Sequence, residues 1–331
     1  MVSCLGSAAD LDTCFAPVKA SSLQVKSTMT LKKGVSFKSF AAHVAIDSSG
    51  FVYLRPLKDG KLTSSVSRIS ANHAESYDLS GYDAMVNRSA LIDYCISADG
   101  HFYALLRKGQ GYLVVTFGPN LAREREVALK ISSTIQLAHI GVLQSGRIVV
   151  DGTSVLQEGM AQPFIGIFEP EGEFSATARV TAATPNLLDV LRGSLLFRIS
   201  STGDVLSLLS RSITVSTPDR IFLMESTSAS FLLGINDTGQ LVNVLSLGSR
   251  TCTNILPGDL AIRGDWAVVR FDNDGKATHA FALYQVSSRR LIRWAMSPPN
   301  PGALLSVDYD GVQFLSVGQE AMVVSTWAGL N

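Results

Sequence analysis

The chain has 331 residues, 46% of them hydrophobic and 17% charged, and its 28 Lys and Arg residues balance its 28 Asp and Glu residues. This length supports one large buried core or several small ones. A formal net charge of +0 provides no field to attract nucleic acid or an anionic membrane surface, so we expect neither as a partner. No apolar run approaches the length of a membrane span, so we expect no span either.

The N-terminal residues 1–21 are expected to form a flexible tail. They lack the apolar core of a signal peptide, so the chain is either cytoplasmic or, if it is a mature form, exported to the periplasm or secreted. Cys4 and Cys14 lie close together in this tail and would be able to form a disulfide in an exported protein. We favour an ordinary tail with a free thiol, and we expect Cys95 and Cys252 to be core or loop thiols rather than a pair.

From residue 22 onward the chain repeats one pattern, a tight turn followed by a strand rich in β-branched and aromatic residues. SADGHFYALL (97–106) shows it in full, and related segments are IDSSGFVYL (46–54), LQSGRIVV (143–150), SSTGDVLSLL (200–209), NDTGQLVNVL (236–245) and VDYDGVQFL (307–315). Asp, Ser or Asn beside Gly supplies the local hydrogen bonds and the positive φ of a hairpin turn. Apolar and polar residues alternate around each turn, which is the period of a half-buried strand.

The spacing of the turns predicts the architecture. The first turn glycines of successive units lie 46 to 61 residues apart, which suits a four-stranded antiparallel sheet with its loops: Gly50, Gly100, Gly146, Gly203, Gly264 and Gly311. Most units carry a second turn between two further strands, as FIGIFEPEGEFSATARV (164–180) does around Gly172. Long apolar patterns at helical spacing do not occur, so each unit is predicted to form four strands.

The sixth unit is short, because the chain ends after the three strand-like segments ALLSVDY, VQFLSV and AMVVSTW. Three strands alone would leave an exposed sheet edge. The strand-like segment SLQVKSTMTL (22–31) precedes the first unit and can complete the last sheet. Residues 22–331 are therefore predicted to form a single all-β domain, a six-bladed β-propeller closed by an N-terminal strand. Seven blades is the alternative, if residues 198–246 hold two units.

The Asp-x-x-Gly turns, the closing strand and the ending PGALLSVDYDGVQFLSVGQEAMVVSTW together resemble uncharacterised bacterial β-propeller proteins that are loosely related to the NHL-repeat group. The similarity extends over nearly the whole repeat region. It implies a propeller architecture but no particular chemistry, because that group includes many binding scaffolds and only a few enzymes.

One set of polar residues recurs at an equivalent position of the repeat. His43, Asp93 and His139 each lie seven residues before a turn glycine, at the start of the innermost strand in three consecutive units. Their neighbours of opposite parity are apolar, so we expect these side chains to face a central channel near its entrance. Two imidazoles and a carboxylate in one cavity can bind a divalent metal or perform acid–base chemistry near neutral pH. Polar residues that only satisfy their neighbours are the simpler interpretation.

Two further residues are candidates for the same surface. Arg198 shares this parity in the fourth unit, and Asp259 lies near the equivalent place in the fifth. The six-bladed lactonase and gluconolactonase-like enzymes carry Glu, Asn and Asp ligands for calcium in their channel. This chain has histidines where those ligands would be wanted, which argues against the same site.

The sequence contains no G-x-S-x-G elbow and no other assembled nucleophile motif. We therefore expect a non-catalytic binding or interaction module, a monomer that holds a partner protein or a small ligand on its channel-entrance face. The alternative is a metal-assisted hydrolase or lyase with His43, Asp93 and His139 at its site. The first interpretation needs no cofactor, and the second needs a divalent metal.

Overall fold

The computed structural model describes residues 14–31, 40–83, 89–97, 99–155, 161–177, 194–199, 205–211, 230–236, 238, 241–247, 255–273, 279–296, 302–308, 311–317 and 322–328. The elements whose bounds are described are strands apart from η1 (Ser80–Tyr82), a single turn of 3-10 helix, and residues 14 and 15 are also helical. Among the described residues, no helix has the length and apolar character that crossing a membrane would require.

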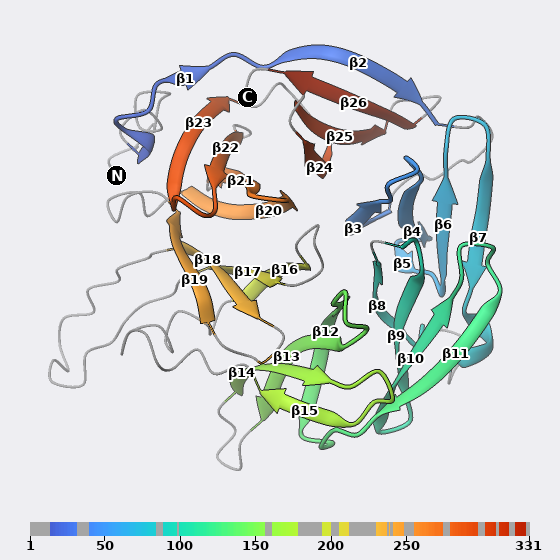
Figure 1. Cartoon of the computed structure of the whole chain (residues 1–331). Coiled ribbons are helices and arrows are strands. Elements are labelled where there is room, and N and C mark those ends of the chain that lie inside the picture. The colour runs from blue at the N-terminus through green and yellow to red at the C-terminus, as the bar shows by residue number, and fades with distance from the viewer. Residues whose placement is uncertain are drawn as a thin grey trace, which may run out of the picture.

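The described strands form six sheets that follow one another along the chain (Figure 1). The first sheet contains β3 (Phe40–Ile46), β4 (Val52–Lys58), β6 (Ser65–Ile69) and β7 (Ala74–Asp78), with β5 (Lys61–Leu62) paired to β4. The second contains β8 (Leu91–Ile96), β9 (Phe102–Lys108), β10 (Gly111–Phe117) and β11 (Arg123–Leu129). The third contains β12 (Ile135–Val142), β13 (Ile148–Val155), β14 (Ala161–Phe168) and β15 (Phe174–Thr177).

The remaining sheets repeat this arrangement. The fourth contains β16 (Ser194–Ile199), β17 (Val205–Arg211), β18 (Ser230–Asn236) and β19 (Leu241–Leu247). The fifth contains β20 (Ile255–Arg263), β21 (Trp266–Asn273), β22 (His279–Gln285) and β23 (Arg290–Met296), extended by β1 (Ala20–Ser21). The sixth contains β24 (Ala303–Asp308), β25 (Gly311–Val317) and β26 (Met322–Ala328), completed by β2 (Gln24–Thr30).

The sheets are arranged in a ring. Their innermost strands contact one another in chain order, from β3 to β8, β12, β16, β20 and β24, and β24 in turn contacts β3. Figure 1 shows the sheets radiating from this inner circle. The prediction of an all-β propeller with four-stranded antiparallel blades is therefore confirmed. The seven-blade alternative is wrong, because the four described strands between residues 194 and 247 pair into one sheet.

The predicted closing strand is also confirmed. β2 pairs with β26 in antiparallel register, with Val25 opposite Trp327 and Met29 opposite Val324. β1 makes a separate, parallel pairing to β23. Residues 14–21 lie inside the segment expected to be a flexible tail, yet they pack onto the fifth sheet and Phe15 is buried.

The apolar core is divided into layers between neighbouring sheets. Between the first and second sheets, the rings of Tyr77 and Phe102 stack with centroids 4.0 Å apart, and Tyr53 stacks beside them. Between the sixth and first sheets, Leu315 packs in one buried cluster with Val52. This last layer closes the ring through side chains as well as through β2.

The turn chemistry follows the sequence pattern. Gly50 adopts φ +83° between β3 and β4, where its amide donates to the carbonyl of Asp47. The Asp47 carboxylate accepts hydrogen bonds from the amides of Ser49 and Phe51, which fixes the turn locally. Equivalent first turns have Gly100, Gly146 and Gly264 at positive φ, whereas Gly203 lies outside the described residues.

Candidate functional site

Each innermost strand contains an irregularity in its pairing with the next strand. The register shifts at Phe40/Val44, Leu91/Asp93, Leu137/His139, Ser194/Leu196, Pro257/Asp259 and Leu304/Ser306. A bulge bends its strand and re-aims the side chains beside it. The predicted residues Asp93, His139 and Asp259 directly follow such a shift, and His43 lies within the shifted stretch of β3. The polar residues that recur in the sequence therefore lie beside bulges that recur in the innermost strands.

The structure brings His43 and Asp93 into direct contact across two sheets. Nδ1 of His43 lies 2.6 Å from Oδ1 of Asp93. The His43 ring also stacks on Tyr94, with centroids 4.6 Å apart and planes within 12°. The Tyr94 hydroxyl shares its single proton between two carbonyl oxygens, that of His43 at 3.0 Å and that of Tyr53 at 3.1 Å. Contacts with Tyr94 and Asp93 therefore fix the ring, the backbone carbonyl and the Nδ1 atom of His43.

Asp93 connects three consecutive sheets. Its Oδ1 contacts His43 in the first sheet, and its Oδ2 accepts a hydrogen bond from the Ile140 amide of the third sheet at 3.1 Å. Burial alone would raise the pKa of Asp93, but the charges and hydrogen bonds of His43, His139 and this amide outweigh burial and lower it. Asp93 is therefore a buried carboxylate that remains ionised.

His139 is hydrogen-bonded to a carboxylate that was not among the predicted residues. Its Nδ1 lies 2.7 Å from Oδ1 of Asp151, on the neighbouring strand β13. The Asp151 side chain is buried, as is that of Asp93. Asp151 was not predicted as a site residue, although a carboxylate within the apolar run of IVVDGTSV (148–155) indicates that a buried partner is required.

Asp259, elsewhere in the ring, repeats the contact of Asp93 with a backbone amide of the next inner strand. Its Oδ2 accepts from the Leu304 amide of the next inner strand at 3.1 Å, as Asp93 does from Ile140. Arg270 lies 3.8 Å from the same oxygen. β20 and β12 are separated by β16 in the ring, so Asp259 belongs to a different part of the inner circle. Arg198 lies in β16, and its side chain is outside the part of the structure that is described.

The result is a pair of partly exposed imidazoles anchored to buried carboxylates. The side chains of His43 and His139 are 23% and 29% exposed, whereas those of Asp93 and Asp151 are 8% and 5% exposed. An imidazole whose Nδ1 faces a carboxylate presents Nε2 to a ligand, as an acceptor when neutral and a donor when protonated. Within the described residues, no group of three or more His, Cys, Asp or Glu side chains is placed to hold one metal ion.

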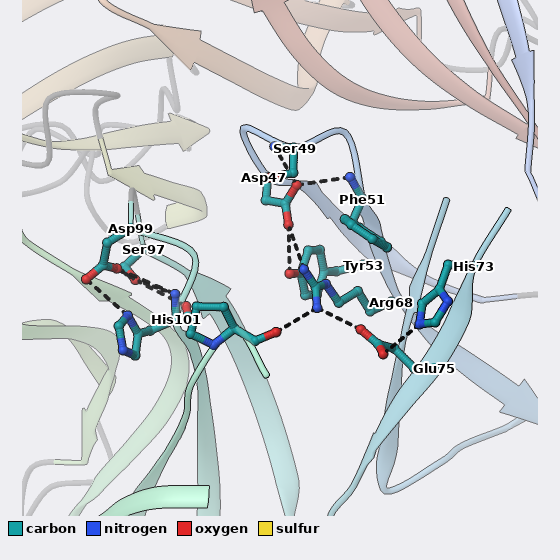
Figure 2. Close-up of polar contacts among 11 residues, drawn as sticks. Asp47, Ser49, Phe51, Tyr53, Arg68, His73, Glu75, Ser97, Asp99 and His101 are labelled. Atoms are coloured by element: carbon teal, nitrogen blue, oxygen red, sulfur yellow. Dashed lines mark hydrogen bonds and ion pairs between the residues drawn. The ribbon is translucent and has the colours of Figure 1, made fainter. Parts of the chain in front are cut away.

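A second polar cluster joins the first and second sheets near their turns (Figure 2). The Arg68 guanidinium donates to Glu75 at 2.7 Å and to the Pro119 carbonyl at 2.9 Å, and it lies 4.0 Å from the centroid of the Phe51 ring. His73 contacts the other oxygen of Glu75 at 3.0 Å. Arg68 and Glu75 lie opposite each other on the paired strands β6 and β7, and the Pro119 contact joins this pair to the β10–β11 turn of the second sheet, so we assign the cluster a structural role.

Known protein structures are similar to this chain in fold. No family model matches the chain, and no curated protein matches it. Similar solved structures include the PQQ-bound aldose sugar dehydrogenase of Streptomyces coelicolor, with a TM-score of 0.52 and 12% identity over 94% of this chain and 99% of that chain. A Dyadobacter fermentans protein of unknown function has a TM-score of 0.52 and 8% identity over 93% and 99%. A Bacteroides vulgatus protein has a TM-score of 0.50 and 8% identity over 94% and 99%. At such identities the likeness shows the β-propeller fold alone.

Proposed function

We propose that the protein is a non-catalytic binding module that holds a small polar ligand against His43 and His139 on the inner strands. The observation that carries this proposal is the fixed pair of imidazoles, each partly exposed and each anchored through Nδ1 to a buried carboxylate. A rigid polar pair of this kind fixes the orientation of a ligand at low entropic cost.

The carboxylates support binding rather than catalysis. Asp93 has one oxygen on His43 and the other on the Ile140 amide, so both are engaged in joining sheets. A general base or a metal ligand would need at least one of these oxygens to face the reacting group. We therefore assign Asp93 and Asp151 the role of orienting the histidines.

The experiment is a thermal-shift screen of small molecules that carry carboxylate, hydroxyl or amide groups. A ligand that binds only the folded protein raises its melting temperature. We expect at least one compound to raise the melting temperature of wild type and of a His73→Ala control, whose side chain is 59% exposed and contacts Glu75 instead of a carboxylate of this site. The shift should disappear in His43→Ala and His139→Ala. A compound whose shift survives both substitutions would place its site elsewhere and contradict the proposal.

A metal-assisted hydrolase or lyase at the same residues is the second candidate. One observation favours it, because metal-ligating histidines usually direct their other ring nitrogen to a carboxylate, as His43 and His139 do. The two imidazoles would need further ligands from water or from residues beyond the described set. Elemental analysis of the purified protein separates the candidates. Stoichiometric Zn, Mn, Ni or Fe that is lost in both His43→Ala and His139→Ala would replace our proposal with this one.

We further infer that each of the six sheets is one blade, because their innermost strands form one closed circle of contacts. The outer side of β26 is paired with β2 of the same chain and not with a second copy, which supports a monomer. The relationship to NHL-repeat propellers of bacteria stays a prediction. Light scattering coupled to size-exclusion chromatography would test the oligomeric state, and we expect the mass of a monomer.

A further inference from the structure

Asp93 acts as a hydrogen-bond acceptor at both of its carboxylate oxygens. The Ile140 amide donates to Oδ2 at 3.1 Å, and Oδ1 lies 2.6 Å from Nδ1 of His43, a contact that one proton occupies. Burial acts to raise the pKa of Asp93, but His43 and this amide hold it below its ordinary value. A carboxylate with a lowered pKa is a much weaker base than an imidazole, so the proton in the contact belongs to the ring. His43 therefore carries a proton on Nδ1.

The position of this proton decides what His43 offers to a ligand. Asp93 engages Nδ1, and the side chain of His43 is 23% exposed, so Nε2 is the nitrogen left for a ligand. A neutral imidazole has one N–H proton, and with that proton on Nδ1 its Nε2 has a lone pair and accepts a hydrogen bond. His139 faces Asp151 through Nδ1 in the same way, at 2.7 Å, so we expect the same tautomer there.

The charges near His43 also oppose an anionic ligand. Arg55 is a buried cation whose guanidinium donates to the Thr63 carbonyl at 2.7 Å. Burial lowers the pKa of Arg55, and the charge of Asp93 acts against that effect, so the two ions stabilise each other. The positive charge of Arg55 is thus offset by Asp93, and Asp151 places a second carboxylate beside the other histidine. These charges favour a neutral or cationic group over an anionic one.

We propose that the ligand of this site presents hydroxyl or ammonium donors to the two imidazoles at neutral pH, and that carboxylates and other anionic groups are rejected. The inference rests on the proposed function, because it names the chemistry of the ligand at the same site. Asp93 and Asp151 are then positioning residues that select the ligand class, since they decide which ring nitrogen holds the proton. With the proton on Nε2 instead, the same histidines would donate to a ligand and would suit a carboxylate.

Proton–nitrogen correlation NMR spectra of the labelled full chain test the tautomer, because the protonated and unprotonated nitrogens of a neutral imidazole differ widely in chemical shift. At about pH 8, where imidazoles are neutral, we expect Nδ1–H for His43 and His139. His73 is an internal control of the opposite kind, since its Nε2 lies 3.0 Å from Oε2 of Glu75 and should hold the proton. His43→Gln, His139→Gln and His73→Gln assign the signals. Nε2–H at His43 would overturn the proposal and leave the binding role intact.

Removal of one carboxylate tests its control of the tautomer. Asp151→Ala takes away the acceptor at Nδ1 of His139, so we expect His139 to gain a population with Nε2–H. His43 should keep Nδ1–H in this variant, which also reports that its contact with Asp93 persists in the folded protein. If His139 stays wholly Nδ1–H without Asp151, the carboxylate does not select the ligand class and the proposal is wrong.

Three probes on a two-carbon skeleton test the ligand class: ethylene glycol, ethylammonium and acetate. At about pH 8 we expect ethylene glycol or ethylammonium to shift the Nε2 signal of His43, and the response to each separates a hydroxyl ligand from an ammonium ligand. Acetate should bind about tenfold more weakly. An equal or stronger response to acetate would contradict the ligand class but not the binding site. If all three probes leave His43 unchanged, the proposed binding role fails together with the ligand class.

Discussion

The carboxylate of Asp93 lies between His43 of one sheet and the Ile140 amide of another, so a single side chain ties three neighbouring sheets at their inner strands. Asp259 contacts the Leu304 amide in the same way. In both places the carboxylate follows a bulge in its own strand and accepts a hydrogen bond from an amide of the next inner strand. At these two places, neighbouring inner strands are therefore joined by hydrogen bonds from backbone to side chain.

Asp93 makes the stability of the protein depend on acid. Its folded pKa is lowered below the usual value of 3.8, so the unfolded chain takes up a proton first as the pH falls. The stabilisation is thus fully present above pH 3.8 and is lost below it. Asp93→Asn should cost about 1.5–3 kcal/mol at pH 7 through the loss of a charged hydrogen bond. Urea denaturation between neutral and acidic pH should show wild type and Asp93→Asn converging, whereas the exposed control Asp59→Asn follows wild type throughout.

Substitutions of Asp259 separate the contribution of its hydrogen bond with the Leu304 amide from the contribution of its charge. Asp259→Asn keeps an oxygen that can accept from the Leu304 amide, so we expect a loss below about 1.5 kcal/mol in the free energy of unfolding. Asp259→Ala leaves that buried amide without its acceptor, and the loss should reach about 1–3 kcal/mol. Chemical denaturation of both variants measures the difference. If the Asn variant loses as much as the Ala variant, the charge of Asp259 near Arg270 is the dominant contribution instead.

Arg68 should be sensitive even to a conservative change. Its planar guanidinium bonds Glu75 and the Pro119 carbonyl while it covers the Phe51 ring, a combination that an ammonium group cannot reproduce. We expect Arg68→Lys to lower the free energy of unfolding by about 1–2 kcal/mol. Arg123→Ala, which removes a side chain that is 60% exposed, should have a smaller effect, because water and salt screen an exposed ion pair. Equal effects in thermal denaturation would mean that the Arg68 cluster contributes no more than a surface ion pair.

Gly302 should be among the least replaceable glycines. It has φ +84°, and a Cβ there would lie 1.9 Å from the Leu315 carbonyl oxygen. Gly60 has a similar φ of +73° but open space around it. Gly60→Ala should therefore cost only the backbone strain, about 1–2 kcal/mol. Gly302→Ala adds a collision with backbone and should exceed about 3 kcal/mol or prevent folding, as circular dichroism and the yield of soluble protein would show. Similar melting temperatures for the two variants would contradict this reading.

The sequence predicted the features that local chemistry determines. Asp47 and Gly50 form their turn through contacts within a few residues, so the pattern alone was sufficient. The closing strand followed from the need to cover an exposed edge. Register shifts depend instead on how two strands pair along their whole length, so the bulges beside Asp93 and His139 were not visible in the sequence.

The ordered arm was missed for a related reason. Phe15 is buried by Trp294 and Phe271, which are far away in the sequence, and a short segment without periodicity gives no sign of such contacts. The three predicted residues were brought together only in part. His43 and Asp93 are in contact, whereas Nδ1 of His139 is hydrogen-bonded to the carboxylate of Asp151 on its own sheet.

The pairing of β2 with β26 sets the order in which the protein can be made. β2 is synthesised before all the strands that separate it from its hydrogen-bonding partner β26. Until β26 has been made, the Gln24–Thr30 segment lacks that partner, and pairing across so great a sequence separation is slow. The circle therefore closes after its other sheets have been synthesised, and the interval before closure is when the nascent chain is most open to misassembly.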